Sequence, residues 1–177
     1  MKEMKFDDKL ISSEIVFKGK LLTIQKKILK NGEGLVYERE VIKRPDAVAV
    51  VALVGEDVLL VKQYRAALDM PLLELPAGII EDCSPEETAH KELIEETGHK
   101  AGSLKLMNKF YSSVGYTNEL IYIYEASDLV EVAPDPEEEE IIEIIKMPIK
   151  EAVDGIKSGK IVDAKTIIGL LLAGNEQ

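Results

Sequence analysis

The chain of 177 residues has one cysteine, no tryptophan and only two histidines. A single cysteine excludes an internal disulfide and favours a reducing compartment, so we expect a cytoplasmic protein. No stretch approaches the roughly 18 apolar residues of a membrane span. The opening ten residues also lack the apolar core of a secretory leader. These absences lead us to expect no membrane partner.

Positive charge is in short supply. The chain has 22 lysines and arginines against 33 aspartates and glutamates, a formal net charge of −11. This balance argues against nucleic acid as a partner, because two polyanions repel. A small phosphate substrate remains compatible, since a bound metal ion inverts the local field. The length suits one domain with a small appendage.

Three glutamates stand out in residues 75–98, which read LPAGIIEDCSPEETAHKELIEETG. Glu92, Glu95 and Glu96 are spaced i, i+3 and i+4, so a helix places them on one face. Crowded carboxylates repel one another unless a cation lies among them, and hard oxygen ligands suit Mg²⁺ or Mn²⁺. The alternative is a solvated acidic helix face.

Local signals define where this helix begins and ends. Ser84 has the character of an N-cap, with Pro85 at the first helical position and Glu87 as the capping-box partner. Gly98 suits the left-handed position that closes a helix. Just upstream, residues 75–78 predict a strand-to-loop turn that brings backbone carbonyls near the carboxylates.

This segment resembles the Nudix box of the Nudix hydrolases, G-x5-E-x7-R-E-U-x-E-E-x-G-U, where U is a bulky apolar residue. Gly78 matches the opening glycine. The end of the motif is matched by Glu92, Leu93, Glu95, Glu96 and Gly98.

The middle of the box departs from the pattern. Cys83 stands where the early glutamate is expected, and the loop of residues 79–82 is one residue short. Lys91 replaces the arginine, and His99 replaces the final apolar residue. The resemblance implies that the glutamate and arginine pair, so their joint loss avoids leaving one buried charge alone. Altered support of metal ligands can change affinity or activity by ~10–100-fold.

The hydrophobic pattern divides the chain in two. We expect a small antiparallel β region in residues 1–45, with a turn at Asn31 and Gly32. We expect an α/β domain in residues 46–177, an α/β/α sandwich with a mixed sheet, as the resemblance implies. Strands are expected at residues 14–17, 21–29, 35–42, 47–54, 58–64, 104–111, 119–125 and 141–147, and the closing helices at 149–157 and 164–172, the last capped by Asp163.

The phrases VIKRPDAVAVV, VKQYR, LLELPAG and FYSSVGYTNE extend the resemblance to the ADP-ribose pyrophosphatase subgroup. Members of this subgroup are typically homodimers that exchange their N-terminal strands. The resemblance implies substrate-binding roles for Arg44, Arg65, Glu74, Gly78, Tyr116 and Glu119. An ordinary structural role remains open for both arginines, a strand-end salt bridge for Glu74, and packing at a loop base for Tyr116. Val114 stands where the subgroup commonly has proline, which argues mildly against strict ADP-ribose specificity.

The acidic run PDPEEEEIIEII precedes a predicted strand. By resemblance it carries a catalytic loop in which Glu138 is the general base and Glu140 a metal ligand, with a register uncertainty of about one residue; a solvated acidic loop is the alternative. The same resemblance implies that the Ala77 carbonyl, Glu92 and Glu96 hold metal. Glu95, assigned to the catalytic set, would bind a further metal or water.

The expected reaction is Mg²⁺-dependent hydrolysis, with Mn²⁺ possible, of a nucleoside diphosphate linked to another group. ADP-ribose yielding AMP and ribose 5-phosphate is the leading substrate by resemblance. Two alternatives stay open. One is another Nudix substrate, such as a nucleotide sugar, a dinucleoside polyphosphate or an oxidised nucleotide. The other is a sensor that binds a nucleotide without cleaving it.

Overall fold

A computed structural model describes residues 7–133 and 142–174. The chain forms two compact units, the first comprising Met1–Asp46 with Tyr111–Glu119 and the second Ala47–Phe110 with Leu120–Gln177. Within the described residues, no helix is long and apolar enough to cross a membrane.

The first unit contains a three-stranded antiparallel sheet in the order β1-β2-β3, formed by Lys9–Lys18, Thr23–Lys30 and Val36–Lys43. The predicted turn is present, and the Asn31 side chain accepts the amide hydrogens of Glu33 at 3.1 Å and Leu35 at 2.9 Å. None of residues 7–46 is buried, and every residue of β1 is exposed. This sheet therefore has no core of its own among the described residues.

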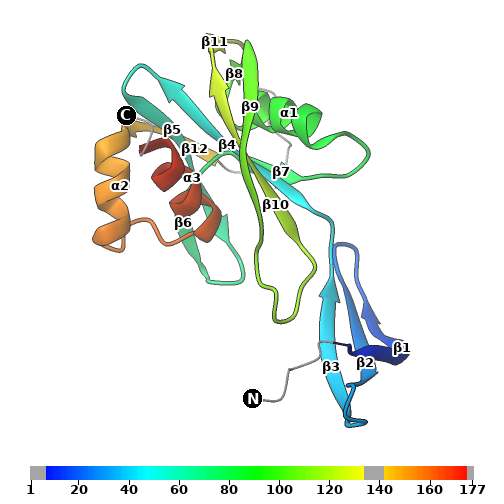
Figure 1. The fold of residues 1–177 in the computed structure, drawn as a ribbon. Helices are drawn as coiled ribbons and strands as arrows, with labels where there is room; N and C mark the ends of the chain where they lie inside the picture. The colour runs from blue at the N-terminus through cyan, green and yellow to red at the C-terminus, as the bar shows by residue number, and fades with distance from the viewer. Residues whose placement is uncertain (1–6, 134–141, 175–177) are drawn as a thin grey trace. The chain divides into compact units, whose positions relative to one another are not determined.

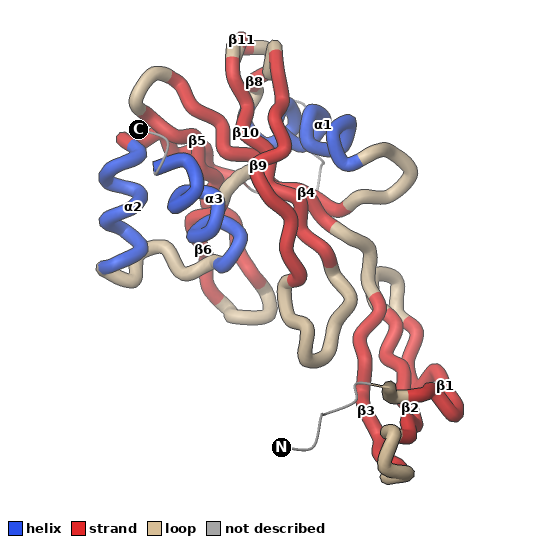
Figure 2. Tube along the Cα trace, in the orientation of Figure 1, coloured by secondary structure: helices blue, strands red, loops and turns tan. Residues whose placement is uncertain are grey.

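The second unit is built on a mixed seven-stranded sheet, coloured red in Figure 2 with the other strands. Its main path runs β12-β5-β4-β10-β9, while β6 pairs with β5 and β7 pairs with β4. β10 is parallel to β4, and the other pairings of β4 and β5 are antiparallel. The strands are β4 (Ala47–Val54), β5 (Asp57–Arg65), β6 (Met70–Glu74), β7 (Ala77–Ile79), β9 (Ser103–Tyr111), β10 (Leu120–Ser127) and β12 (Ile142–Pro148).

Helices cover both faces of this sheet, as Figure 1 shows. The helix α1 (Pro85–Thr97) lies on one face, and α2 (Ile149–Lys157) and α3 (Ala164–Gly174) lie on the other. Side chains of a strand point alternately to its two faces. Accordingly Val48 and Val50 pack in the α1 cluster, whereas Ala49 and Val51 pack in the α2–α3 cluster. The predicted α/β/α sandwich with an N-terminal antiparallel region is confirmed.

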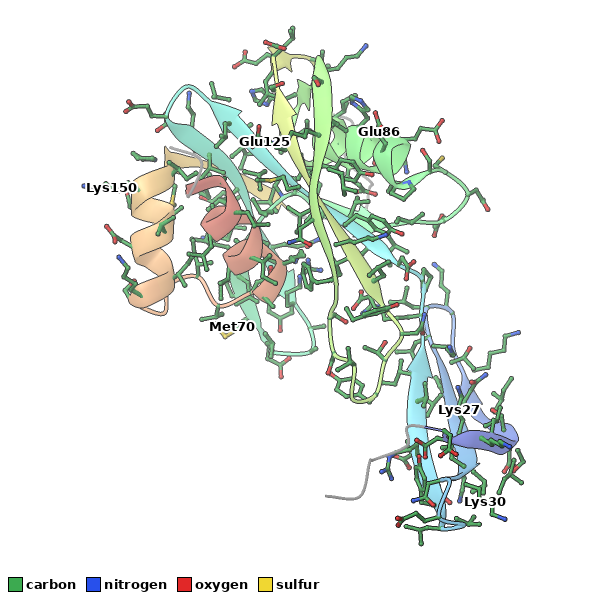
Figure 3. The ribbon with its side chains drawn as sticks, in the orientation of Figure 1. Lys27, Lys30, Met70, Glu86, Glu125 and Lys150 are labelled. Atoms are coloured by element: carbon green, nitrogen blue, oxygen red, sulfur yellow. The ribbon has the colours of Figure 1, made fainter. Side chains whose placement is uncertain are left out.

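The predicted helix ends are also confirmed. Ser84 and Glu87 form a reciprocal capping box at the start of α1, with Pro85 in its first turn. Gly98 closes the helix with φ 63°, a left-handed conformation that suits glycine. At α3, the Asp163 carboxylate accepts the Thr166 amide hydrogen at 3.0 Å. In Figure 3, Glu86 is labelled on α1 and Lys150 projects from α2 away from the sheet.

Some short strands differ from the sequence expectation. Ala77 and Gly78, expected in a turn, pair with Ala49 and Val48 as part of β7. The strands β8 (His99–Lys100) and β11 (Val130–Glu131) were not predicted, and β6 was implied only by the strand end expected at Glu74. Strands of two to five residues leave too few positions for an alternating pattern to be recognised, and pairing with a neighbouring strand creates them.

Candidate active site

A pocket of about 420 Å³ lies where α1 meets the ends of β5 and β7. This volume is within the range of small-molecule sites, roughly 300–1,000 Å³. It brings together five of the predicted site residues, which are Arg65, Ala77, Gly78, Glu92 and Glu95. The lining is completed by Gln63, Ile79, Glu81, Asp82, Cys83, Thr88 and Lys91.

Gly78 lies directly against the carboxylate of Glu92. A Cβ atom built on Gly78 would fall 2.0 Å from Glu92 Oε1 and 2.0 Å from its Cδ. No side chain fits there unless Glu92 moves. The opening glycine of the box is thus explained by close approach between backbone and carboxylate, since its φ is not in the left-handed range.

Glu96 connects the helix to the turn that precedes it. Its side chain is buried, and Glu96 Oε2 accepts the Ala77 amide hydrogen at 2.8 Å. From the sequence, backbone carbonyls are expected near the carboxylates, whereas the group that contacts Glu96 is the Ala77 N–H. The bond fixes β7 against α1 and so fixes the relative positions of Glu92 and the Ala77 backbone.

The two departures from the box lie in the same pocket. Lys91 pairs with Glu95 one turn along the helix at 3.5 Å, and its side chain is 56% exposed. Cys83 is exposed and lines the pocket. Glu95 is 19% exposed at its side chain, and helix pairs at this spacing typically contribute about 0.3–0.5 kcal/mol to stability.

Arg65 is held by a buried carboxylate. Its Nε and Nη2 donate to the two oxygens of Glu74, each at 2.6 Å. Lys165 donates to the same carboxylate. Burial alone would raise the pKa of Glu74, but the hydrogen bond from Arg65 and the nearby Lys165 together lower it below the ordinary 4.5. The hydrogen bond to Glu74 likewise raises the pKa of Arg65. Of the two roles left open for Glu74, the structure shows the salt bridge.

Three further predicted residues belong to the other compact unit, and two are not described. Arg44, Tyr116 and Glu119 belong to the first unit, where Arg44 Nη2 pairs with Glu119 at 3.1 Å and the Tyr116 carbonyl accepts the Ile42 amide hydrogen. Glu138 and Glu140 are outside the described residues.

Four polar residues of the pocket were missed by the sequence reasoning: Gln63, Glu81, Asp82 and Thr88. Gln63 could have been found, because it is two residues before Arg65 on β5 and side chains at that spacing share a face. Glu81 and Asp82 lie in the shortened loop of residues 79–82, for which the motif offers no register.

The donor chemistry of the pocket fits a hard divalent cation. Glu92 and Glu95 line it, Glu96 adjoins it through Ala77, and carboxylate oxygens are the ligands that such ions prefer. Among residues 7–133 and 142–174, no three acidic, histidine or cysteine side chains already converge as a complete ligand set. Further donors would therefore be supplied by backbone, water, substrate or other residues.

Comparison with known proteins agrees with this geometry. The NUDIX domain profile matches residues 43–168. An ADP-ribose pyrophosphatase of Bacillus subtilis is 34% identical, covering 90% of this chain and 89% of its own length. A methanol dehydrogenase activator of Bacillus methanolicus is 34% identical over 93% of this chain and 91% of its own. A GDP-mannose pyrophosphatase of Cronobacter sakazakii is 34% identical over 78% of each chain.

Among solved structures, an ADP compounds hydrolase superposes with a TM-score of 0.89. It covers 98% of this chain and 96% of its own, at 23% sequence identity, so the likeness concerns the fold. Taken with the pocket, these findings define an enzyme of the pyrophosphatase class. The chain belongs to the NUDIX family. Enzymes of this family generally use divalent metal ions.

Proposed function

We propose that the protein hydrolyses the diphosphate of a nucleoside diphosphate linked to another group, with ADP-ribose as the leading substrate and Mg²⁺ as the metal. The observation that carries the proposal is the pocket in which Arg65 faces the same space as Gly78 and the acidic residues of α1. An ADP-ribose pyrophosphatase at 34% identity supports the choice of substrate.

In this proposal Arg65 binds a phosphate oxygen, because its planar guanidinium can donate two hydrogen bonds to one phosphate group. The Ala77 carbonyl, Glu92 and Glu96 hold the cation, with Glu140 as a further ligand, and Glu95 binds a further metal or water. When bound, a divalent metal offsets the negative charge that develops on the phosphate oxygens during hydrolysis. Gly78 keeps the backbone close enough for Glu92 to reach its position.

The water that attacks phosphorus must lose a proton, and we assign Glu138 as the base that accepts it. The new bond joins the water oxygen to one phosphorus, and the bond from that phosphorus to the bridging oxygen breaks. From ADP-ribose the products are AMP and ribose 5-phosphate. Arg44, Glu74, Tyr116 and Glu119 complete the proposed substrate-binding set, with Glu74 acting through Arg65.

A nucleotide sugar is the second candidate substrate. A GDP-mannose pyrophosphatase that is 34% identical over 78% of the chain favours it. Val114, which stands where the ADP-ribose subgroup commonly has proline, favours it as well. The geometry of the pocket does not discriminate, because both substrates offer the same diphosphate to Arg65 and α1.

A substrate panel tests the proposal. ADP-ribose, GDP-mannose and a dinucleoside polyphosphate are each incubated with the protein and Mg²⁺ or Mn²⁺, and nucleoside monophosphate release is measured by chromatography. We expect AMP from ADP-ribose at the highest kcat/KM, and none after chelation of the metal. Faster cleavage of GDP-mannose would transfer the assignment to nucleotide sugars, and no release from any substrate would overturn it.

A further inference from the structure

A chain of ionic contacts connects the pocket to the opposite face of the sheet. Arg65 ends β5, Glu74 ends β6, and Lys165 lies in the first turn of α3. Glu74 is 1% exposed and accepts hydrogen bonds from both Arg65 and Lys165. Lys165 is itself only 12% exposed at its side chain, so this contact is shielded from water.

The contact with Glu74 determines which donors of Arg65 face the pocket. Nε and one hydrogen of Nη2 are directed to the carboxylate. The other N–H groups of the guanidinium remain for a ligand, because the group is rigid and planar. The side chain of Arg65 is 39% exposed and lines the pocket. Arg65 is therefore oriented before any substrate arrives.

Lys165 is fixed from its other side as well. The Asp163 carboxylate accepts one hydrogen bond from the Lys165 ammonium at 3.0 Å and another from the Thr166 hydroxyl at 2.6 Å. That hydroxyl in turn accepts the amide hydrogen of Leu75, the residue after Glu74, at 2.8 Å. The first turn of α3 and the end of β6 are thus bonded to each other by two routes, and Lys165 has little freedom to leave Glu74.

The charges explain why a lysine is useful here. Glu74 alone would neutralise Arg65 and weaken its attraction for a phosphate. Lys165 offsets this carboxylate in turn. With Asp163 bonded to Lys165, the charges of Arg65, Lys165, Glu74 and Asp163 sum to zero, whereas the group without Lys165 would carry a net negative charge. Partly buried charges interact more strongly than exposed ones, so this compensation is felt in the pocket.

We propose that Lys165 is a positioning residue that acts through Glu74 to hold Arg65 in its phosphate-binding orientation and to keep this ionic group from becoming net negative. The inference rests on the proposed function in that it takes a phosphate group as the ligand of Arg65. It assigns a role in substrate binding to a helix that contributes no residue to the lining of the pocket.

The test is a double-mutant cycle in the full-length protein. Lys165→Met should lower kcat/KM for ADP-ribose about tenfold, mostly through KM, because a misplaced binding group loses its contact. In an Arg65→Met background the same change should alter kcat/KM less than about twofold, since contacting groups couple and independent ones do not. Lys157→Met is the matched control, since Lys157 pairs with Asp154 at 3.1 Å but is 76% exposed. We expect that control to leave kcat/KM unchanged.

A second readout does not depend on catalysis. The Arg65 Nε–H signal, assigned in ¹⁵N NMR spectra by its loss in Arg65→Lys, should be sharp in the parent protein. It should broaden in Lys165→Met and in the milder Lys165→Gln, which serves if the methionine variant fails to fold. An unchanged signal, or equal losses of kcat/KM with and without Arg65, would overturn the inference. If the parent protein cleaves no nucleotide yet the signal responds as expected, the proposed function fails and the positioning role of Lys165 stands.

Discussion

The distance between Gly78 and Glu92 makes a specific demand on one backbone position. A methyl group at Gly78 would overlap the Glu92 carboxylate, which is the mobile end of a flexible side chain. We therefore expect Gly78→Ala to displace Glu92 while the fold remains intact. Activity should fall at least ~10-fold, with a change in unfolding free energy below about 1 kcal/mol.

Kinetics and thermal unfolding of purified Gly78→Ala measure both effects. Gly115→Ala is the matched control, because a Cβ there meets nothing within 4 Å and its backbone is not left-handed. Full activity in Gly78→Ala would show that the position of Glu92 does not matter for hydrolysis.

The carboxylates of α1 give a direct prediction for the proposed metal site. Glu92→Gln and Glu96→Gln should each reduce kcat at least ~100-fold with cooperative unfolding retained, because a lost charged ligand weakens transition-state stabilisation. Glu86→Gln, on an exposed position of the same helix, serves as control. Turnover near that of the parent in either variant at saturating metal would refute the metal-site assignment.

Glu74 should make stability depend on pH. Its folded-state pKa is lowered by Arg65 and Lys165 despite its burial. Two further carboxylates belong to the surroundings: Asp163 is bonded to Lys165, and Glu96 lies near Arg65. A lowered pKa contributes stability that is present above the unfolded value, near 4.5, and is lost as pH falls through the folded value. Glu74→Gln should therefore cost about 2–3 kcal/mol at pH 7 and less as pH falls below about 4.5.

Urea unfolding of the parent and of Glu74→Gln at several pH values between 7 and 3 checks this prediction. Glu143→Gln, which removes an exposed pair with Lys62, should show little difference at any pH. A stability difference that does not change with pH would contradict the assigned titration.

The helix α1 shows how far sequence reasoning extends. Its start at Ser84, its end at Gly98 and the common face of its glutamates follow from local rules of capping and periodicity, and the structure confirms them. The Arg65–Glu74–Lys165 group could not be predicted in the same way. Its members come from three elements, and only the packing of α3 against the sheet brings Lys165 to Glu74.

The altered box gives a prediction for the loop that precedes α1. Lys91→Arg alone should help little, since no carboxylate stands at Cys83 for it to grip. Lys91→Arg combined with Cys83→Glu should raise kcat/KM for ADP-ribose by more than the two single changes predict together. The two positions line one pocket, which allows them to meet. A double-mutant cycle on kcat/KM measures the coupling, and strict additivity would show that they do not communicate.

The first unit exposes an apolar surface on β1. On β1, Leu10, Ile11, Ile15, Val16 and Phe17 are each more than half exposed. Contiguous exposed apolar side chains usually mark an interface. We propose that this region, about residues 1–45, forms the interface of a homodimer, in agreement with the subgroup resemblance.

Light scattering of the parent protein at micromolar concentration should give the mass of two chains. The double variant Ile15→Lys, Phe17→Lys should give the mass of a single chain. Leu171→Lys, which introduces the same charge at an exposed leucine of the second unit, should remain dimeric. A monomeric mass for the parent protein would exclude this interface.

The parallel pairing of β4 with β10 has a consequence for folding during synthesis on the ribosome. Ala47 pairs with Ile121, so the middle of the sheet joins segments made far apart in time on the ribosome. β4 and β5 can form their hairpin early, but the apolar β4 then waits for β10 to be synthesised. Such long-range pairing folds slowly, because a large loop must close first. During translation the nascent second unit therefore exposes its most apolar strand until most of the chain has emerged, and chaperone protection is needed most in that interval.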